Sequence, residues 1–427
     1  DTAVVNMRKG LSVGYTYPKI LMERVLPQAK DMIVADIKES IFWGPIQDMP
    51  DGISREDSTR LKKSYEEAIK NKIIPSYQKL YDFLQKEYIP KTRTTTGFSD
   101  LPEGREHYQH LINFWTTTNL TPDEIFEIGQ QEISRIRLEM EKIKSQVGFK
   151  GNLKAFFDHV NTSKKFMPYK TAEEVIEGYN AIHKKMEPQL KKLFNMVPKT
   201  GFQIRQTEAF RAASASAEYN PGTADGSRPG IFYAPILDAT KYNYTGMETL
   251  FLHEAIPGHH YQISLQYENE ELPKFRRFLW YGAYGEGWAL YTEALGKELG
   301  LYTDPYQYFG SLGDEIHRAI RLVVDVGMHA KGWSREQAIK YMIDNEAISL
   351  EAATAEIERY MAVPAQALSY KLGQLKILEL RKKAEQELDD KFNIALFHDE
   401  VLKYGCLPLD ILESIVNDWI QKQNAGV

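Results

Sequence analysis

The sequence contains a single cysteine and no long apolar run. Because Cys406 is the one cysteine among 427 residues, the chain cannot form an internal disulfide framework or a zinc site built from several thiolates. No segment reaches the ~20 predominantly apolar residues that a transmembrane helix needs. Any metal site in this chain must therefore be built from histidine and carboxylate side chains.

The chain also lacks a dominant charge. It carries 53 Lys and Arg against 59 Asp and Glu, a formal net charge of -6, which argues against nucleic acid or an anionic membrane surface as a partner. The contents of 43% hydrophobic and 26% charged residues are typical of a globular protein. At this length we expect more than one subdomain. We assign residues 1–200 to a helical subdomain and residues 201–427 to a second one that carries the functional motifs.

Most of the chain has the periodicity of amphipathic helices. Helix starts are indicated at Thr121, where Pro122 and two acidic residues form a first turn, and at Ser334, which begins a capping-box pattern. The sequence therefore predicts a mainly α fold. The clearest predicted helices cover residues 61–84, 121–147, 172–196, 305–330, 334–345, 351–362, 365–387 and 409–423.

Residues 201–238 differ from the rest of the chain. Phe202 and Ile204 alternate with polar residues, and a turn-rich segment separates residues 215–219 from residues 230–236. We predict two or three short strands, which would form a small sheet beside the segment that follows. An edge strand there could pair with an extended peptide. An ordinary connecting hairpin is the alternative.

The most informative segment is His-Glu-Ala-Ile-Pro-Gly-His-His at residues 253–260. Three of the ten histidines fall within these eight residues, and Glu254 follows the first of them. Imidazoles bind divalent transition metals, and a free carboxylate beside the metal can accept a proton from water. The segment therefore predicts a metal-dependent hydrolase with His253 as a ligand and Glu254 as the general base.

The second histidine ligand is not where a usual zinc-peptidase helix has it. That helix spaces its two histidines four residues apart, and here Pro257 occupies this position and interrupts the helix. A bulge of two extra residues, eased by Gly258, would bring His259 to the place of the second ligand. The alternative is His260, which shares a face with His253 on an ideal helix but lies ~10 Å further along its axis. We favour His259.

A third ligand is expected from another helix. Glu286 lies between two glycines at the front of an apolar run, and a glutamate buried there is costly unless it is paired or bound to metal. We predict Glu286 as the third ligand; the alternative is that it caps the start of the helix. Glu293 is seven residues further on and lies on the same face, so it is a candidate for orienting an imidazole.

A polar stripe recurs every four residues in an otherwise apolar segment. It consists of His317, Arg321, Asp325 and His329, with Arg318 beside the first. A solvated helix face would more commonly mix lysine and glutamate. We predict that the stripe faces a cleft, that Asp325 orients His329 or an arginine, and that the arginines contact substrate. A buried ion-pair network between helices is the alternative.

These motifs carry a resemblance to a known family. The chain resembles the bacterial proteins grouped as domain of unknown function 885, which carry an HExxPGHH run and are regarded as relatives of the gluzincin metallopeptidases. The resemblance covers nearly the whole chain. The residues that carry it are 225–230, 253–260, 286–291, 318–329, 331–333 and 364–373.

The resemblance also bears on the N-terminus and on location. Residues 1–14 have neither an initiator methionine nor the pattern of a secretory signal, and members of the family are usually longer at this end. We therefore expect an N-terminally truncated chain. Many members carry export signals, which implies a periplasmic or extracytoplasmic location.

More distantly, the layout is similar to the thimet oligopeptidase, angiotensin-converting enzyme and thermostable carboxypeptidase families. This similarity implies a helical gluzincin-like scaffold with a deep cleft, of which residues 1–200 would form one wall. It places the second ligand at His259, right after Gly258. A downstream histidine and tyrosine act on the reaction intermediate in those families, and His329 and Tyr370 are the nearest equivalents. The two-residue insertion in the motif is a departure that leaves the tightness of metal binding open.

Together these observations predict a zinc-dependent peptidase that hydrolyses short peptides as an oligopeptidase or carboxypeptidase. One Zn²⁺ ion would be held by His253, His259 and Glu286, and manganese or cobalt could occupy the same ligands. Two other functions fit the sequence. One is a metal-dependent amidase on modified amino-acid or peptidoglycan-derived substrates, and the other is a non-catalytic peptide-binding protein that kept the fold.

Further residues are predicted to contact the substrate. Tyr370, His329 or Arg321 would stabilise the oxyanion or hold a substrate carboxylate, and Tyr360 is a second candidate tyrosine. Arg228 would line the substrate edge from the loop before the metal-site helix. The sequence does not specify the oligomeric state or a choice between exo- and endo-action.

Overall fold

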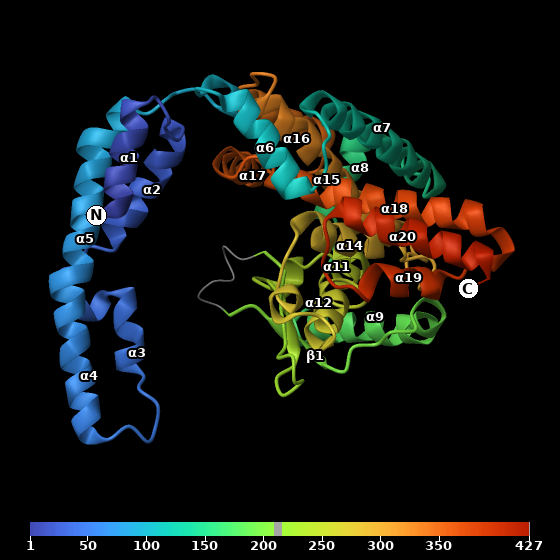
Figure 1. Ribbon diagram of the computed structural model, residues 1–427, viewed down its shortest axis with the longest axis horizontal. Helices are drawn as coiled ribbons and strands as arrows, with labels where there is room; N and C mark the ends of the chain where they lie inside the picture. The colour runs from blue at the N-terminus through green and yellow to red at the C-terminus, as the bar shows by residue number, and fades with distance from the viewer. Residues whose placement is uncertain (209–215, 427) are drawn as a thin grey trace. The chain divides into compact units, whose positions relative to one another are not determined.

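A computed structural model describes residues 1–208 and 216–426 (Figure 1). The fold is mainly α with one small sheet, which confirms the predicted fold class. The chain forms two compact units, the first made of Asp1–Arg105 with Met328–Arg335 and the second of Glu106–Gly327 with Glu336–Val427. The boundary therefore lies near residue 105, whereas the sequence suggested residue 200. The helix before residue 200 belongs to the second unit because its apolar face lies in that unit's core.

The first unit is helical and packs around two small apolar clusters. One continuous helical run extends from Arg55 to Lys91, and two π-helical turns, η3 (Ile69–Ile73) and η4 (Leu84–Tyr88), interrupt its α-helical pattern. Ile69 is buried against Trp43, and Tyr88 against Phe83. The other elements are α1 (Thr2–Ser12), α2 (Lys19–Asp31), η1 (Ile37–Glu39), η2 (Ile41–Trp43), α3 (Gly44–Gln47), α4 (Arg55–Ala68), α5 (Ile74–Phe83), η5 (Ile89–Lys91) and η6 (Phe98–Asp100).

The second unit contains the large core and the functional motifs. In Figure 1 its helices α18 and α20, in orange and red, run alongside each other. Its helices are α6 (Gly104–Thr116), α7 (Pro122–Gln146), α8 (Leu153–Thr162), α9 (Ala172–Leu193), α11 (Met247–Glu254), α12 (His259–Glu268), α13 (Lys274–Arg277), α14 (Gly282–Ala294), α15 (Pro305–His329), α16 (Arg335–Asn345), α17 (Leu350–Ala362), α18 (Ser369–Leu388), α19 (Ile394–Leu402) and α20 (Leu409–Ala425). Short turns are η7 (Lys164–Phe166), η8 (Ala239–Lys241), η9 (Tyr244–Gly246), η10 (Gln366–Leu368) and η11 (Asp389–Lys391).

The predicted helix starts agree with the structure except at two places. The helix predicted from residue 61 begins at Arg55, where the side chain of Ser54 accepts the backbone N–H of Asp57. Thr121 and Glu124 form a capping box in which each side chain accepts the backbone N–H of the other residue. Helix α18, however, starts at Ser369 and not at Ala365. Ala365 has a φ of 66°, in the left-handed region, and its N–H donates to the carboxylate of Asp325 at 3.1 Å. This side-chain contact fixes a turn that the local sequence does not indicate.

The predicted sheet is present and has three strands. In the order β1-β3-β2, β1 (Phe202–Gln206) pairs in parallel with β3 (Gly230–Ala234), and β2 (Glu218–Asn220) pairs with β3 in the antiparallel direction. The register places Phe202 opposite Gly230 and Tyr219 opposite Phe232. Ala215, where a predicted strand began, lies outside the described residues. Strands β2 and β3 form the hairpin that the sequence offered as an alternative, and β1 adds a third strand.

Helix α14 occupies the centre of the second unit's core and makes a close backbone contact with α18. A Cβ on Gly373 of α18 would lie 1.8 Å from the carbonyl oxygen of Ala283, and a Cβ on Gly287 of α14 would lie 2.5 Å from Cα of Gly373. The two backbones meet here because neither helix has a side chain at the contact. None of the described helices is both long and apolar enough to cross a bilayer.

The contact between α14 and α18 predicts the effect of a single methyl group. We expect Gly373→Ala to lower the free energy of unfolding by about 1–3 kcal/mol, because the new Cβ overpacks a backbone contact that cannot yield. Gly313 on α15 is a matched control, since a Cβ there meets no atom within 4 Å, and Gly313→Ala should be neutral or stabilise by up to about 1 kcal/mol. Urea denaturation measures both, and equal midpoints for the two variants would contradict the packing argument.

Candidate metal centre

The His-Glu motif forms two helices joined by a sharp break. Helix α11 ends at Glu254, and α12 begins at His259 after a cis peptide bond between Ile256 and Pro257. A Cβ on Gly258 would lie 1.9 Å from the carbonyl oxygen of His253. Only glycine therefore allows α12 to start directly against the last turn of α11. The structure has a break between two helices where the sequence predicted a bulge within one.

Helix α14 fixes both sides of this break. The indole Nε1 of Trp288 donates to the carbonyl oxygen of Pro257 at 2.8 Å, and Oγ1 of Thr292 donates to that of Leu252 at 2.9 Å. Trp288 and Thr292 are fully buried. The helix that carries Glu286 thus holds the histidine-bearing segments in place through hydrogen bonds that water cannot replace.

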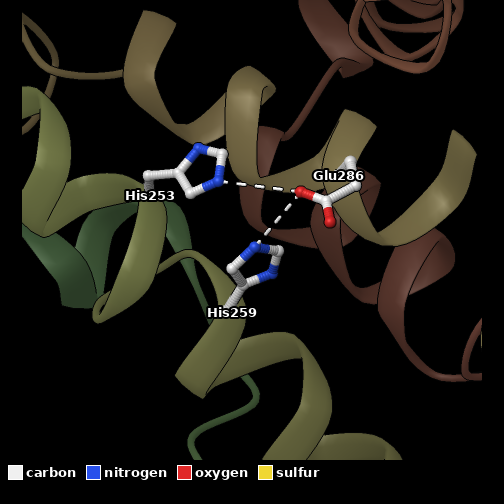
Figure 2. A group of neighbouring side chains, drawn as sticks. All are labelled: His253, His259 and Glu286. Atoms are coloured by element: carbon white, nitrogen blue, oxygen red, sulfur yellow. Dashed lines mark ion pairs between the residues drawn. The ribbon is translucent and has the colours of Figure 1, made fainter. Parts of the chain in front are cut away.

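The break brings His253 and His259 to the same oxygen of the Glu286 carboxylate (Figure 2). Oε2 of Glu286 lies 3.7 Å from Nε2 of His253 and 3.4 Å from Nε2 of His259. One candidate ligand atom from each residue lies within 4.8 Å of the other two. Tetrahedral zinc sites with bonds of ~2.0–2.1 Å separate their ligand atoms by roughly 3.3 Å. The two separations from Glu286 are close to this value, so the three side chains could hold a single divalent ion.

Glu293 sets the direction of the His253 ring. Its Oε1 lies 2.7 Å from Nδ1 of His253, and its Oε2 accepts from Oγ1 of Thr249 at 3.1 Å. With Nδ1 bound in this way, Nε2 is the nitrogen that faces Glu286. A carboxylate behind an imidazole commonly accompanies a histidine that binds metal. The structure thus places Glu293 against His253, and its role in orienting a metal ligand stays a prediction.

The centre has more negative than positive groups. Burial alone would raise the pKa of Glu286, but His259 and His253 outweigh it and lower that pKa well below its ordinary value. Burial likewise opposes the charged form of His253, yet the carboxylates of Glu286 and Glu293 raise the pKa of this imidazole to about 10. A buried group of this composition requires a positive charge, as a proton or as a metal ion.

The glycines on either side of Glu286 admit close neighbours. A Cβ on Gly285 would lie 2.0 Å from the indole of Trp280, and Gly287 meets the backbone of α18. The Trp280 ring in turn lies 5.9 Å from the imidazole of His259, measured between ring centroids. Packing therefore holds His259, whose buried Nδ1 has no hydrogen bond to any described residue.

His260 is directed away from the three-residue centre. Its Nδ1 lies 2.8 Å from Oη of Tyr219 and 3.3 Å from Oγ of Ser264. Burial lowers the pKa of His260 to about 4, so the ring is neutral at pH 7. Of the two adjacent histidines, the structure places His259 in the group that could hold an ion.

The centre opens into a cavity of about 660 Å³ within the second unit. Glu254 lines this cavity together with the three candidate ligands, and no described residue donates a hydrogen bond to its carboxylate. Edge strand β2 contributes Glu218 and Tyr219 to the wall. A cavity bordered by a strand edge agrees with the predicted arrangement, and the deep cleft between subdomains stays a prediction.

Another part of the cavity wall is basic and comes from α15 and α17. Nε of Arg321 donates to Oη of Tyr360 at 2.7 Å, and Nη2 of Arg321 donates to Oε2 of Glu356 at 3.1 Å. Arg359 also binds Glu356, at 2.9 Å, and Arg318 completes the wall. Arg318 and Arg321 thus line the cavity, and Arg321 also takes part in an ion-pair network, as the two interpretations of the sequence expect. The other stripe residues, His317, Asp325 and His329, do not line this cavity.

Sequence reasoning missed Glu356 and Arg359. Glu356 is three residues before Arg359 and four before Tyr360 on α17, so the three lie within about one turn, and this spacing is a signal that could have found them. Burial raises the pKa of Tyr370, and the charge of Glu286 adds to this effect, so its phenol stays protonated. Tyr370 lines the same cavity, as its predicted role requires.

Other predicted residues have different surroundings. The carboxylate of Asp325 is fully buried and accepts from Oη of Tyr108 at 2.6 Å and from the N–H of Ala365; burial raises its pKa to about 7. His329 belongs to the first unit, where its Nδ1 accepts from the N–H of Phe98 at 3.2 Å. Arg228 is exposed and is not among the described residues that line the cavity. The roles assigned to these residues stay predictions.

Fold and site together define a mainly helical protein whose second unit carries a two-histidine, one-glutamate centre. The chain belongs to the family described as "Bacterial protein of unknown function (DUF885)", whose model matches residues 1–416. This agrees with the resemblance stated from the motifs. No curated protein matches the chain.

Two solved structures share the fold. A protein titled "putative lipoprotein" from Colwellia psychrerythraea is 33% identical, with a TM-score of 0.91 over 98% of this chain and 73% of its own length. A "putative lipoprotein of unknown function" from Shewanella oneidensis is 20% identical, with a TM-score of 0.72 over 93% of this chain and 72% of its own. A Pyrococcus furiosus carboxypeptidase also matches, with 11% identity over 98% of both chains, but its TM-score of 0.32 is too low to show a shared fold.

The geometry predicts different effects for the two adjacent histidines. We expect His259→Ala to lower zinc affinity by more than the ~10–100-fold that loss of an outer contact costs, because one of three ligands is removed. His260→Ala is the matched control and should bind zinc like the unchanged protein, since its ring contacts Tyr219 and Ser264. Competition titration with a chromogenic chelator measures both affinities. If only the His260 variant lost zinc, His260 and not His259 would be the ligand.

A second prediction concerns the carboxylate behind His253. Glu293→Gln keeps the size of the side chain and an oxygen that can accept from Nδ1, but removes the negative charge. Zinc affinity should fall by about 10–100-fold. Glu298→Gln, which changes an exposed ion pair with Arg381, should leave the affinity unchanged. Equal affinities in the two variants would argue against an orienting role for Glu293.

Proposed function

We propose that the protein is a metal-dependent hydrolase that cleaves peptide bonds in short peptides. The observation that carries this proposal is the convergence of His253, His259 and Glu286 beside a carboxylate, Glu254, that lines the same cavity. The three would hold one divalent ion, and zinc is the ion that two imidazoles and a carboxylate favour. When bound, the ion supplies Lewis acidity, which polarises a carbonyl group and lowers the pKa of water.

The side chains around the centre divide the remaining chemistry. Glu254 accepts a proton from the attacking water and passes it to the leaving amine, as a general base and then a general acid. Its carboxylate is free for this role because no described residue donates a hydrogen bond to it. Tyr370, whose pKa is raised by burial and by Glu286, donates a hydrogen bond to the oxygen on which negative charge develops.

A peptide is supported as the substrate by the edge strand in the cavity wall. Strand β2 lies at one end of the order β1-β3-β2, so one of its edges has no partner strand among residues 1–208 and 216–426. An extended peptide can add to such an edge through main-chain hydrogen bonds, which are independent of its sequence. The cavity of about 660 Å³ has the size of a site for a small molecule, which favours short peptides over folded proteins.

We further propose an extracytoplasmic location. Both similar structures have titles that contain the words "putative lipoprotein". Export also agrees with the resemblance to a family in which many members carry export signals. Fractionation of cells that express the full-length gene product tests this proposal, and recovery in the cytoplasmic fraction would contradict it.

The general base provides the sharpest test of the proposed reaction. Glu254→Gln should lower kcat by about 10²–10⁴-fold, because the amide cannot accept a proton, and should retain one equivalent of zinc, because the three ligands are unchanged. The control is Glu271→Gln at an exposed position. Hydrolysis of a panel of short peptides, followed by mass spectrometry, gives the rates. Full activity in the Glu254 variant would refute the assigned base.

A further inference from the structure

Two guanidinium groups in the cavity wall have buried N–H groups without a partner. Arg321 is 7% exposed, and its Nε and Nη2 bind Tyr360 and Glu356, but its Nη1 has no hydrogen bond to any described residue. The Nε of Arg318 is also buried without a partner. Arg318 forms no ion pair in the part of the chain that the structure describes. Buried donors without acceptors are costly, so these two groups point to a missing acceptor.

The charge of this wall is compensated only in part, because Asp314 interacts electrostatically with Arg318 and one carboxylate lies in the wall itself. Arg318, Arg321 and Arg359 line the cavity on this side, and Glu356 is the carboxylate that lines it with them. That single carboxylate accepts from both Arg321 and Arg359. The wall therefore keeps a net positive charge in partly dehydrated surroundings, where an anionic group on a ligand would be bound strongly.

The basic wall is joined to the candidate metal centre through one aromatic ring. The guanidinium carbon of Arg321 lies 4.7 Å from the centroid of the Tyr370 ring, and that of Arg318 lies 5.6 Å from it. Tyr370 and Glu286 both line the cavity, and each lies within three residues of the glycine contact between α14 and α18. An anion held by the arginines would thus lie in the same cavity as the bond to be cleaved.

From these contacts we infer that Arg318 and Arg321 bind a carboxylate of the substrate. This inference rests on the proposed function and narrows its substrate class to peptides that carry a carboxylate near the cleaved bond. The carboxylate is the free C-terminus or an acidic side chain. The first source makes the protein a carboxypeptidase that removes short C-terminal segments, and the second makes it selective for Asp or Glu.

Aromatic residues in the cavity wall guide the choice of a probe. Tyr267, Phe278 and Trp280 line the same cavity, and Phe278 and Trp280 are exposed. An aromatic side chain can pack on such rings. N-acetyl-phenylalanine, which carries a free carboxylate, and N-acetyl-phenylalaninamide, which does not, are therefore a matched pair of ligands. N-acetyl-aspartic acid α-amide carries its carboxylate on the side chain and distinguishes the second source.

Isothermal titration calorimetry with the full chain tests the inference without turnover. The acid should bind about 10- to 100-fold more tightly than its amide, the range for hydrogen bonds to a charged group. Arg318→Met should reduce this acid-to-amide ratio to near 1, and Arg321→Lys should reduce it partly, because lysine keeps the charge but loses the fork. Arg205→Met, at an exposed position on β1, is the matched control and should keep the ratio.

Each titration is run on zinc-loaded and on metal-free protein. A carboxylate held by the arginines keeps its preference over the amide when zinc is removed, whereas one held by the ion loses it. Preference for the side-chain carboxylate would support the inference with the second source. Equal binding of acid and amide, no binding of either, or a preference that depends on zinc would overturn it.

The outcome is separate from that of the proposed function. If the acid binds through the arginines but the zinc-loaded protein cleaves no peptide, the hydrolase proposal fails and the carboxylate site remains. If peptides are cleaved, and their C-terminal amides and their analogues with Asn or Gln in place of Asp or Glu are cleaved equally well, the hydrolase proposal holds and the carboxylate site fails. Thermal unfolding of each arginine variant, compared with the unchanged protein, separates loss of the site from loss of the fold.

Discussion

The close approach of Gly258 to the last carbonyl groups of α11 is the constraint on which the candidate site depends. A side chain at this position would overlap the carbonyl oxygens of His253 and Leu252, and α12 could not begin where it does. Pro257 ends the first helix, and Trp288 binds its carbonyl from α14. Through this break, two histidines six residues apart present Nε2 atoms to one carboxylate.

Backbone contacts without side chains recur in the structure around the site. Gly285 admits the indole of Trp280, which packs on His259, and Gly287 meets Gly373 where α14 and α18 touch. Glycine usually weakens a helix. In α14 that cost is offset by dense packing, which holds Glu286 rigidly between two contacts and leaves its carboxylate little freedom to move.

One cavity thus contains two charged regions of opposite sign. The candidate centre gathers the carboxylates of Glu254, Glu286 and Glu293 around His253 and His259, whereas the basic part of the wall carries three guanidinium groups and Glu356. Negative groups gather in one region and positive groups in the other, and each region lacks part of its countercharge. A cation at the first region and an anion at the second would complete the electrostatics, which is the arrangement that we propose for a metal ion and a substrate carboxylate.

The sequence by itself determined the helices, because amphipathic periodicity and capping residues are local signals. It also determined which residue types could bind an ion. With one cysteine, the ligands had to be histidines and carboxylates. The 253–260 segment supplies the histidines, and Glu286 is a glutamate whose burial is unfavourable unless it is paired or bound to metal. Glu293 followed from its place on the same helix face as Glu286. These inferences needed only spacing along one element.

Tertiary structure decided everything that depended on contacts between distant segments. It separated His259 from His260 through a break that the local pattern did not specify, and it gave His260 the hydroxyl of Tyr219 as a neighbour. It paired Asp325 with Tyr108 and Ala365, 217 and 40 residues away in the chain, where the sequence suggested His329 or an arginine. Spacing shows which face a side chain occupies, but its partner comes from whatever element packs on that face, and this packing is a property of the whole fold.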